Sequence, residues 1–121
     1  IIVKDNEVIG SGHNQVIHTN NVTSHAEINA IIDASKNTNN YRLNNAKMYV
    51  TLEPCHMCAK AIIDARIDKV IFAAPEPKTG SIISIDNIYE RIKFNHKTSY
   101  KFGLLQNESS NLLKKFFKTK R

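Results

Sequence analysis

Cys55 and Cys58 are the only cysteines in this chain, and they lie three positions apart. Two cysteines cannot form a framework of several disulfides, so a hydrophobic core must hold the fold. The chain has 121 residues, of which 41% are hydrophobic, which is enough for one packed core and too little for two full-sized ones. We therefore expect a single domain over residues 1–121. In a reducing compartment, so close a pair more often binds a metal ion or does redox chemistry than stabilises a fold.

Segments rich in β-forming residues alternate along the chain with segments of helical spacing. The expected strands are a hairpin within residues 1–12 with its turn at Asp5-Asn6, and the segments 46–52, 69–74 and 98–102. The expected helices cover residues 25–35, the segment after Pro54 as far as Ala65, and residues 85–92 and 105–118. A loop over residues 12–23 leads into the first helix, which Thr23 or Ser24 would cap with its hydroxyl. This alternation predicts a three-layer α/β domain whose sheet has helices on both faces.

The bulk properties limit the partners and the location. Lys and Arg outnumber Asp and Glu by 17 to 11, so the net charge is +6 and nucleic acid is the first partner to consider, although charge alone does not identify it. No apolar run approaches the ~18 residues that span a bilayer, and we expect a soluble, cytoplasmic protein without a membrane partner. The chain opens with Ile1-Ile2-Val3, which looks like the middle of a strand, so we expect that an upstream piece is missing.

Two short motifs each open a predicted helix. His25 and Glu27 open the first, and Cys55 and Cys58 open the second, directly after Pro54. The unpaired N–H groups and positive dipole at a helix start lower the pKa of a thiol and favour the thiolate that zinc requires. Cysteines at i and i+3 share one face, so both sulfurs can reach one ion at about 2.3 Å. Two thiolates and one imidazole leave the fourth tetrahedral position open for water, which is typical of a catalytic zinc site.

Glu27 supplies the second half of the predicted chemistry. Zinc lowers the pKa of bound water from about 15.7 towards 7. Two residues after His25, Glu27 can reach this water without being a ligand, and it can pass the proton to a ring nitrogen and a departing amine. The result is hydrolytic loss of ammonia from an amino-substituted heterocycle. His-x-Glu followed by Pro-Cys-x-x-Cys is the known signature of zinc deaminases, so this step is recognition of a pattern.

Each motif alone has other interpretations. The cysteine pair could be half of a four-cysteine zinc site, which is excluded because no second pair exists, or a redox pair, which leaves His25 and Glu27 without a role. Two further hypotheses stay open: a deaminase of a free base such as guanine or cytosine, and a non-catalytic RNA-binding subunit that keeps zinc for structure. We interpret His56, between the two cysteines, as a bystander that points away from the ion.

Further segments extend the pattern over the whole chain. They are Gly12-His13-Asn14, Thr51-Leu52-Glu53-Pro54, Pro77-Lys78-Thr79-Gly80, Phe94-Asn95-His96 and the terminal Phe116 to Arg121. With them, the sequence resembles the bacterial-type tRNA adenosine deaminases of the cytidine deaminase-like superfamily. The resemblance implies a central mixed sheet of about five strands, one Zn²⁺ per subunit, a homodimer, and conversion of adenosine to inosine at the wobble position of a tRNA anticodon. The base would be flipped into the zinc pocket.

The resemblance also implies individual contacts with the substrate. Asn14 matches the asparagine that hydrogen-bonds the target base, and the backbone N–H of Ala26 lies where the family holds the base edge. Lys78 and Asn95 match positions that grip the anticodon stem-loop. Glu76 stands where the family usually has Asp, and its extra methylene could shift a contact with the neighbouring nucleotide.

The terminal segment carries the last implied contacts. Phe117 and Arg121 belong to a basic, aromatic tail that resembles the family's tRNA-binding tail, in which cations meet phosphates and aromatic rings cover bases or core. Without the family, a solvated basic helix end that favours its own dipole is the preferred interpretation.

Overall fold

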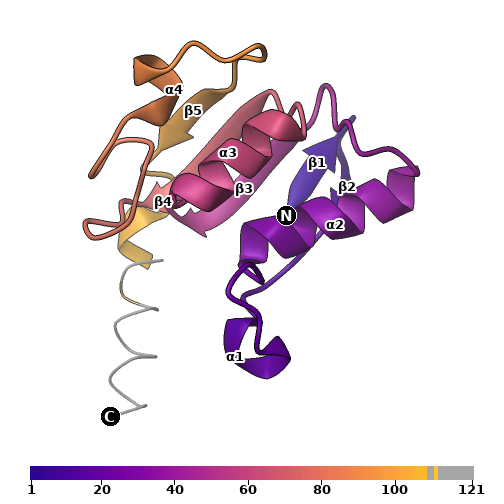
Figure 1. The fold of residues 1–121 in the computed structure, drawn as a ribbon, viewed down its shortest axis with the longest axis horizontal. Coiled ribbons are helices and arrows are strands. Elements are labelled where there is room, and N and C mark those ends of the chain that lie inside the picture. The colour runs from indigo at the N-terminus through magenta and orange to yellow at the C-terminus, as the bar shows by residue number, and fades with distance from the viewer. Residues whose placement is uncertain (109–110, 112–121) are drawn as a thin grey trace.

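The computed structural model describes residues 1–108 and 111, and its five strands form one mixed sheet in the order β2-β1-β3-β4-β5 (Figure 1). The elements are β1 (Ile2–Lys4), β2 (Glu7–Gly10), α1 (Val16–Thr19), α2 (Ala26–Thr38), β3 (Lys47–Leu52), α3 (His56–Asp64), β4 (Lys69–Ala74), α4 (Ile88–Arg91) and β5 (Ser99–Phe102). β1 runs antiparallel to both β2 and β3, whereas β3, β4 and β5 are parallel neighbours. The predicted α/β fold with about five strands in a mixed sheet is confirmed.

The hairpin at the start of the chain has the turn that the sequence predicts. Asp5 and Asn6 join β1 to β2 with φ values of 52° and 62°. Two consecutive positive φ values characterise the type I′ turn, whose twist matches that of the strands it joins. Asp and Asn tolerate this left-handed conformation better than other residues with a Cβ.

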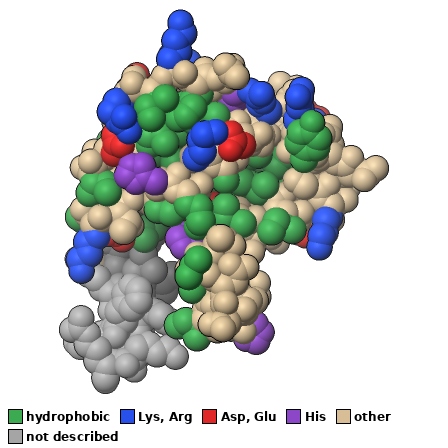
Figure 2. All heavy atoms as spheres, viewed as in Figure 1, with side chains coloured by type: hydrophobic (Ala, Val, Ile, Leu, Met, Phe, Trp, Pro, Cys, Tyr) green, Lys and Arg blue, Asp and Glu red, His purple; other side chains and the backbone are tan. Residues whose placement is uncertain are grey.

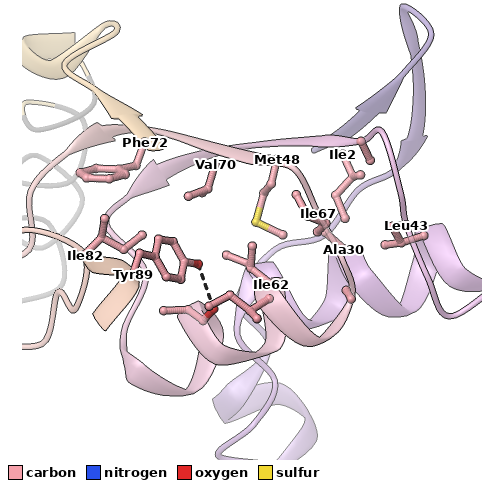
Figure 3. Packing of buried hydrophobic residues seen from close by; sticks show 14 of the residues in the cluster. Ile2, Ala30, Leu43, Met48, Ile62, Ile67, Val70, Phe72, Ile82 and Tyr89 are labelled. Atoms are coloured by element: carbon pink, nitrogen blue, oxygen red, sulfur yellow. Dashed lines mark hydrogen bonds between the residues drawn. The ribbon is translucent and has the colours of Figure 1, made fainter. Parts of the chain in front are cut away.

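One face of the sheet packs against α2 and α3 (Figure 1). Met48 and Val70 point from the strands towards Ile62 of α3, and Ile2 and Ala30 extend this core under α2 (Figure 3). All five side chains are at most 3% exposed. On the opposite face, Tyr49, Ile71, Leu104 and Leu105 are among the residues that line a cavity of about 360 Å³. Of the terminal helix predicted for residues 105–118, only residues 105–108 and 111 belong to the described part of the chain, and 106–108 are helical there.

A close contact with a glycine decides which side of α2 is buried. The buried residues of α2 are Ala30 and Ala34, whereas Ile32 is 48% exposed. A Cβ added to Gly10 would lie 2.6 Å from the Cβ of Ala34 and 2.7 Å from the carbonyl oxygen of Ala30. At so short a separation between strand and helix, only small side chains fit.

Some local expectations differ from the structure. The N-cap of α2 is His25, without a side-chain capping bond, so the predicted cap at Thr23 or Ser24 is wrong. The hydroxyl of Thr23 instead donates to the Asn21 side chain at 2.7 Å. The predicted loop 12–23 contains the short α1, and the predicted helix at 85–92 is reduced to α4. Within the described part of the chain, no helix combines the length and apolar character needed to cross a membrane.

Candidate metal centre

His25, Cys55 and Cys58 come together from two helix starts. One ligand atom of each residue lies within 4.8 Å of the other two. Nδ1 of His25 lies 3.6 Å from Sγ of Cys55 and 3.4 Å from Sγ of Cys58. In a tetrahedral zinc site with bonds of about 2.0 Å to nitrogen and 2.3 Å to sulfur, two such atoms lie about 3.5 Å apart. The three side chains are therefore already spaced as ligands of one ion, with Nδ1 as the nitrogen donor.

The local backbone explains why these side chains converge. His25 and Cys55 are the N-cap residues of α2 and α3, with extended ψ values of 156° and 176°, and neither side chain caps its own helix. The carbonyl groups of both residues accept the first hydrogen bonds of their helices. Asn29 N–H donates to the His25 carbonyl at 3.0 Å, and Ala59 N–H donates to the Cys55 carbonyl at 2.8 Å. The position that usually carries a capping hydroxyl or carboxylate is occupied here by a candidate metal ligand. Pro54 directly precedes the N-cap residue Cys55, so it lies outside α3, which begins at His56.

The pKa values of the two thiols are shifted in opposite directions. Hydrogen bonding with the Cys58 side chain lowers the pKa of Cys55 to about 5, against the effect of burial, and backbone N–H groups and His25 contribute in the same direction. The bond with Cys55 and burial raise the pKa of Cys58, which is fully buried. A bound cation would favour the thiolate form of both side chains.

Glu27 lies in the first turn of α2, beside the sulfur of Cys58. Burial raises the pKa of this carboxyl, while its own backbone N–H and the Cys58 side chain act in the opposite direction as hydrogen-bond donors. Glu27 and Ala26 line a cavity of about 110 Å³, to which Gly12 and Thr51 also contribute. The arrangement can hold a cation with three protein ligands and place one carboxyl next to it, at the edge of a small cavity.

The predicted base-binding residues lie near the start of α2. Gly12 packs against this helix so closely that a Cβ would lie 2.7 Å from the Ala26 carbonyl oxygen. Asn29 of the same helix donates from its side chain to the His13 carbonyl at 2.8 Å. Asn14 follows directly, and its side-chain oxygen accepts from Val16 N–H at 3.0 Å. The structure therefore brings the segment that carries Asn14 to the helix that carries Ala26.

The other predicted RNA contacts lie in separate segments. Lys78 is exposed, and the carboxylate of Glu76 accepts from Lys78 N–H at 3.0 Å. Asn95 is exposed and lines a cavity of about 440 Å³ next to α4, together with Arg91 and other residues but none of the candidate ligands. Phe117 and Arg121 lie outside the described residues.

The side chain of His56 contacts Asp86, which lies shortly before α4. Its Nε2 lies 2.9 Å from the Asp86 carboxylate, which also accepts two bonds of 2.8 Å from the Arg91 guanidinium. Arg91 and His56 hold the pKa of Asp86 well below its usual range. His56 is not among the residues whose ligand atoms converge.

Sequence reasoning missed one residue, Glu53. The sequence marked it only as part of a motif, yet the residue is 3% exposed and its carboxylate accepts hydrogen bonds from the backbone N–H groups of Glu76, Ile82, Ile83 and Ser84. Burial alone would raise its pKa, but the donors around it, led by the Ser84 hydroxyl, hold the pKa below its ordinary value. An acidic residue between an apolar strand and a proline was the only available signal, because its partners lie far away in sequence.

Comparison with known proteins first gives the class. The family model of the MafB19-like deaminases matches residues 1–121. A solved guanine deaminase from Bacillus subtilis has a TM-score of 0.61 and 29% identity, over 95% of this chain and 76% of that chain. Together with the mixed sheet and the candidate metal centre, these matches place the chain among the deaminases.

Closer relatives define the family. The tRNA-specific adenosine deaminase of Aquifex aeolicus is 42% identical over 98% of this chain and 78% of that protein. That of Haemophilus influenzae is 43% identical over 100% of this chain and 70% of that protein. A structure from a study of A-to-I editing by tRNA:A34 deaminases at the wobble position has a TM-score of 0.88 and 38% identity, over 93% of this chain and 81% of that chain. The chain belongs to the family of tRNA-specific adenosine deaminases.

Proposed function

We propose that this chain converts adenosine to inosine at the wobble position of a tRNA anticodon, with residues 1–121 as one catalytic domain. One observation carries the proposal: three ligand atoms from the starts of α2 and α3 converge within 4.8 Å, with the carboxyl of Glu27 beside them. The names of the relatives support tRNA as the substrate. The structural match is also better to the tRNA:A34 deaminase, with a TM-score of 0.88, than to the guanine deaminase, with 0.61.

The donor set fits zinc, which His25, Cys55 and Cys58 would hold. Thiolates and imidazole are its usual protein ligands, and three of them leave one position for catalysis. When bound there, zinc supplies the acidity that makes hydroxide available from water at neutral pH. The remaining chemistry falls to the side chains of this chain.

Glu27 moves the protons in this proposal. It takes a proton from the attacking water and gives it to N1 of the adenine ring. It then carries the second proton to the 6-amino group, which leaves as ammonia while the water oxygen stays on C6. Its position next to Cys58, without being one of the converging ligands, supports this role.

The same proposal assigns the substrate contacts. Asn14 and the Ala26 N–H hold the flipped base, and they lie on adjoining segments at the start of α2. Glu76, Lys78 and Asn95 contact the anticodon stem-loop. The tail residues Phe117 and Arg121 contact tRNA through stacking and charge.

We further propose that the protein acts as a homodimer. Ile32 of α2 is 48% exposed and Ile17 of α1 is 96% exposed. Hydrophobic side chains are also visible on the face of the molecule that carries α2 and α3 (Figure 2), so apolar surface is available for a second copy. Light scattering on the purified protein tests this proposal, which predicts twice the mass of one chain. A monomer at all concentrations contradicts it.

An inosine assay on a panel of substrates tests the function. The panel holds anticodon stem-loops with adenosine at the wobble position, free adenosine, guanine and cytosine. Inosine should form in a stem-loop and not from free adenosine, because the loop supplies the contacts that place the base. Robust turnover of guanine or cytosine, with none in any stem-loop, would show that the enzyme acts on free bases.

A further inference from the structure

Glu53 lies between β3 and the cysteine pair, and its buried carboxylate is surrounded by donors from a distant segment. Oε2 accepts from the N–H groups of Ile82, Ile83 and Ser84 at 2.9, 2.7 and 3.0 Å. Oε1 accepts from Glu76 N–H at 3.0 Å and from the Ser84 hydroxyl. A buried carboxylate is costly unless its oxygens are hydrogen-bonded, and charge-assisted bonds of this kind are stronger than neutral ones.

These donors come from residues 76–84, which form part of the connection between β4 and α4 and are called the 76–84 loop below. Its backbone passes so close to Glu53 that a Cβ on Gly80 would overlap the carboxyl group and lie 2.6 Å from the Glu76 carbonyl oxygen. The loop is also joined to the residue after Glu53, since Ser81 N–H donates to the Pro54 carbonyl at 2.9 Å. Gly80, Ser81 and Ile82 are buried. The loop is thus wrapped around one carboxylate.

The contacts form a continuous path from the metal centre to an exposed cation. Cys55 follows Glu53 by two residues. Oε1 of Glu53 binds the Glu76 N–H, and the Glu76 carboxylate in turn accepts from Lys78 N–H at 3.0 Å. Lys78 itself is exposed, in the turn over residues 77–79.

We propose that Glu53 is a positioning residue: its carboxylate fixes the 76–84 loop against residues 54–58, here called the metal-binding turn, so that Glu76 and Lys78 meet the tRNA at a set distance from the reacting base. This inference rests on the proposed function. Glu53 touches no reacting atom, so its loss weakens the grip on the RNA and leaves the metal and the proton transfer in place. The effect should therefore fall on KM and on the Kd for the stem-loop more than on kcat.

Glu53→Gln is the most direct variant. Glutamine keeps the shape but puts an NH₂ donor where one of two acceptor oxygens was, and both oxygens face N–H groups. Hydrogen exchange at the amides of Ile82, Ile83 and Ser84 should become about tenfold faster. KM and Kd for an anticodon stem-loop should rise about fivefold, with one zinc per chain retained. Glu7→Gln, which changes an exposed glutamate on β2, is the matched control and should resemble wild type.

A second variant keeps the Glu53 carboxylate and disturbs the loop that surrounds it. The added Cβ of Gly80→Ala displaces the loop from Glu53, so it should also accelerate exchange and raise KM. It keeps the inference testable if Glu53→Gln does not fold.

Three results overturn the inference: unchanged exchange and unchanged KM, a loss of zinc in Glu53→Gln, or a fall in kcat at constant KM. If wild type binds a stem-loop but does not deaminate it, the proposed function fails. Kd and hydrogen exchange then still decide the role of Glu53.

Discussion

His25 and Cys55 start helices of 13 and 9 residues that pack into the core, whereas Asn14, Lys78 and Asn95 lie exposed in irregular segments. The first region is held by helix backbones and by buried residues such as Ile62. The second is held largely by hydrogen bonds between side chains and backbone, such as those from the Asn29 side chain to the His13 carbonyl and from Glu76 N–H to the Glu53 carboxylate. In the proposed function, chemistry that needs atoms within a few tenths of an ångström is thus placed on helix starts, and contact with the RNA is placed on segments outside the helices and strands.

The comparison predicts that changes in the helix-start region abolish chemistry, whereas changes in the loops reduce affinity. Cys58→Ala should have the largest effect. It removes a fully buried candidate ligand, so zinc content should fall from one per chain to near zero and inosine formation to background. Elemental analysis and the inosine assay measure both quantities. A variant that keeps a full zinc complement would show that Cys58 is not a ligand.

Glu27→Ala should have the next largest effect. Loss of general acid–base catalysis should lower kcat by about 10³-fold or more. Zinc content and the Kd for the stem-loop should stay close to wild type, because Glu27 is not one of the three converging ligands. A variant with substantial turnover would contradict the proton-transfer role, and a variant without zinc would place Glu27 in the metal site itself.

Lys78→Ala tests the loop region, where we expect a weaker effect on binding alone. One lost phosphate contact should weaken binding by several-fold and reduce the slope of log Kd against log salt by about 1, with kcat nearly unchanged. The matched control is Lys47→Ala, because the exposed Lys47 lies at the start of β3, the end away from the metal-binding turn. Equal salt slopes in both variants would remove Lys78 from the RNA interface.

Asp86→Asn should have the smallest effect. It weakens the contacts of Asp86 with His56 and Arg91, both of which are more than half exposed, and exposed ion pairs contribute little. Both kcat and KM should stay within about threefold of wild type. A large loss of activity would show that this cluster helps to place the metal-binding turn, and the division between the two regions would then need to be redrawn.

Much of the architecture was predictable because it depends on local patterns. The alternating strands and helices, the turn at Asp5 and Asn6, and the strand over 69–74 follow from periodicity and turn chemistry. The three candidate ligands were predictable for the same reason, since each motif marks a helix start and the spacing of Cys55 and Cys58 puts both on one face.

What sequence reasoning missed depends on contacts between distant residues. Burial of Ala34 rather than Ile32 in α2 follows from the approach of Gly10, which lies 24 positions before Ala34. The role of Glu53 depends on N–H groups 23 to 31 positions away. The cap expected at Thr23 or Ser24 failed because His25 occupies the N-cap position as a candidate ligand.

The metal centre itself is tested most directly by the zinc X-ray absorption spectrum of the purified protein. The account predicts one zinc per chain, with two sulfur neighbours at about 2.3 Å and an imidazole nitrogen at about 2.0 Å. Protein purified from zinc-supplied cells without the metal, or with a zinc shell that contains no sulfur, would contradict it.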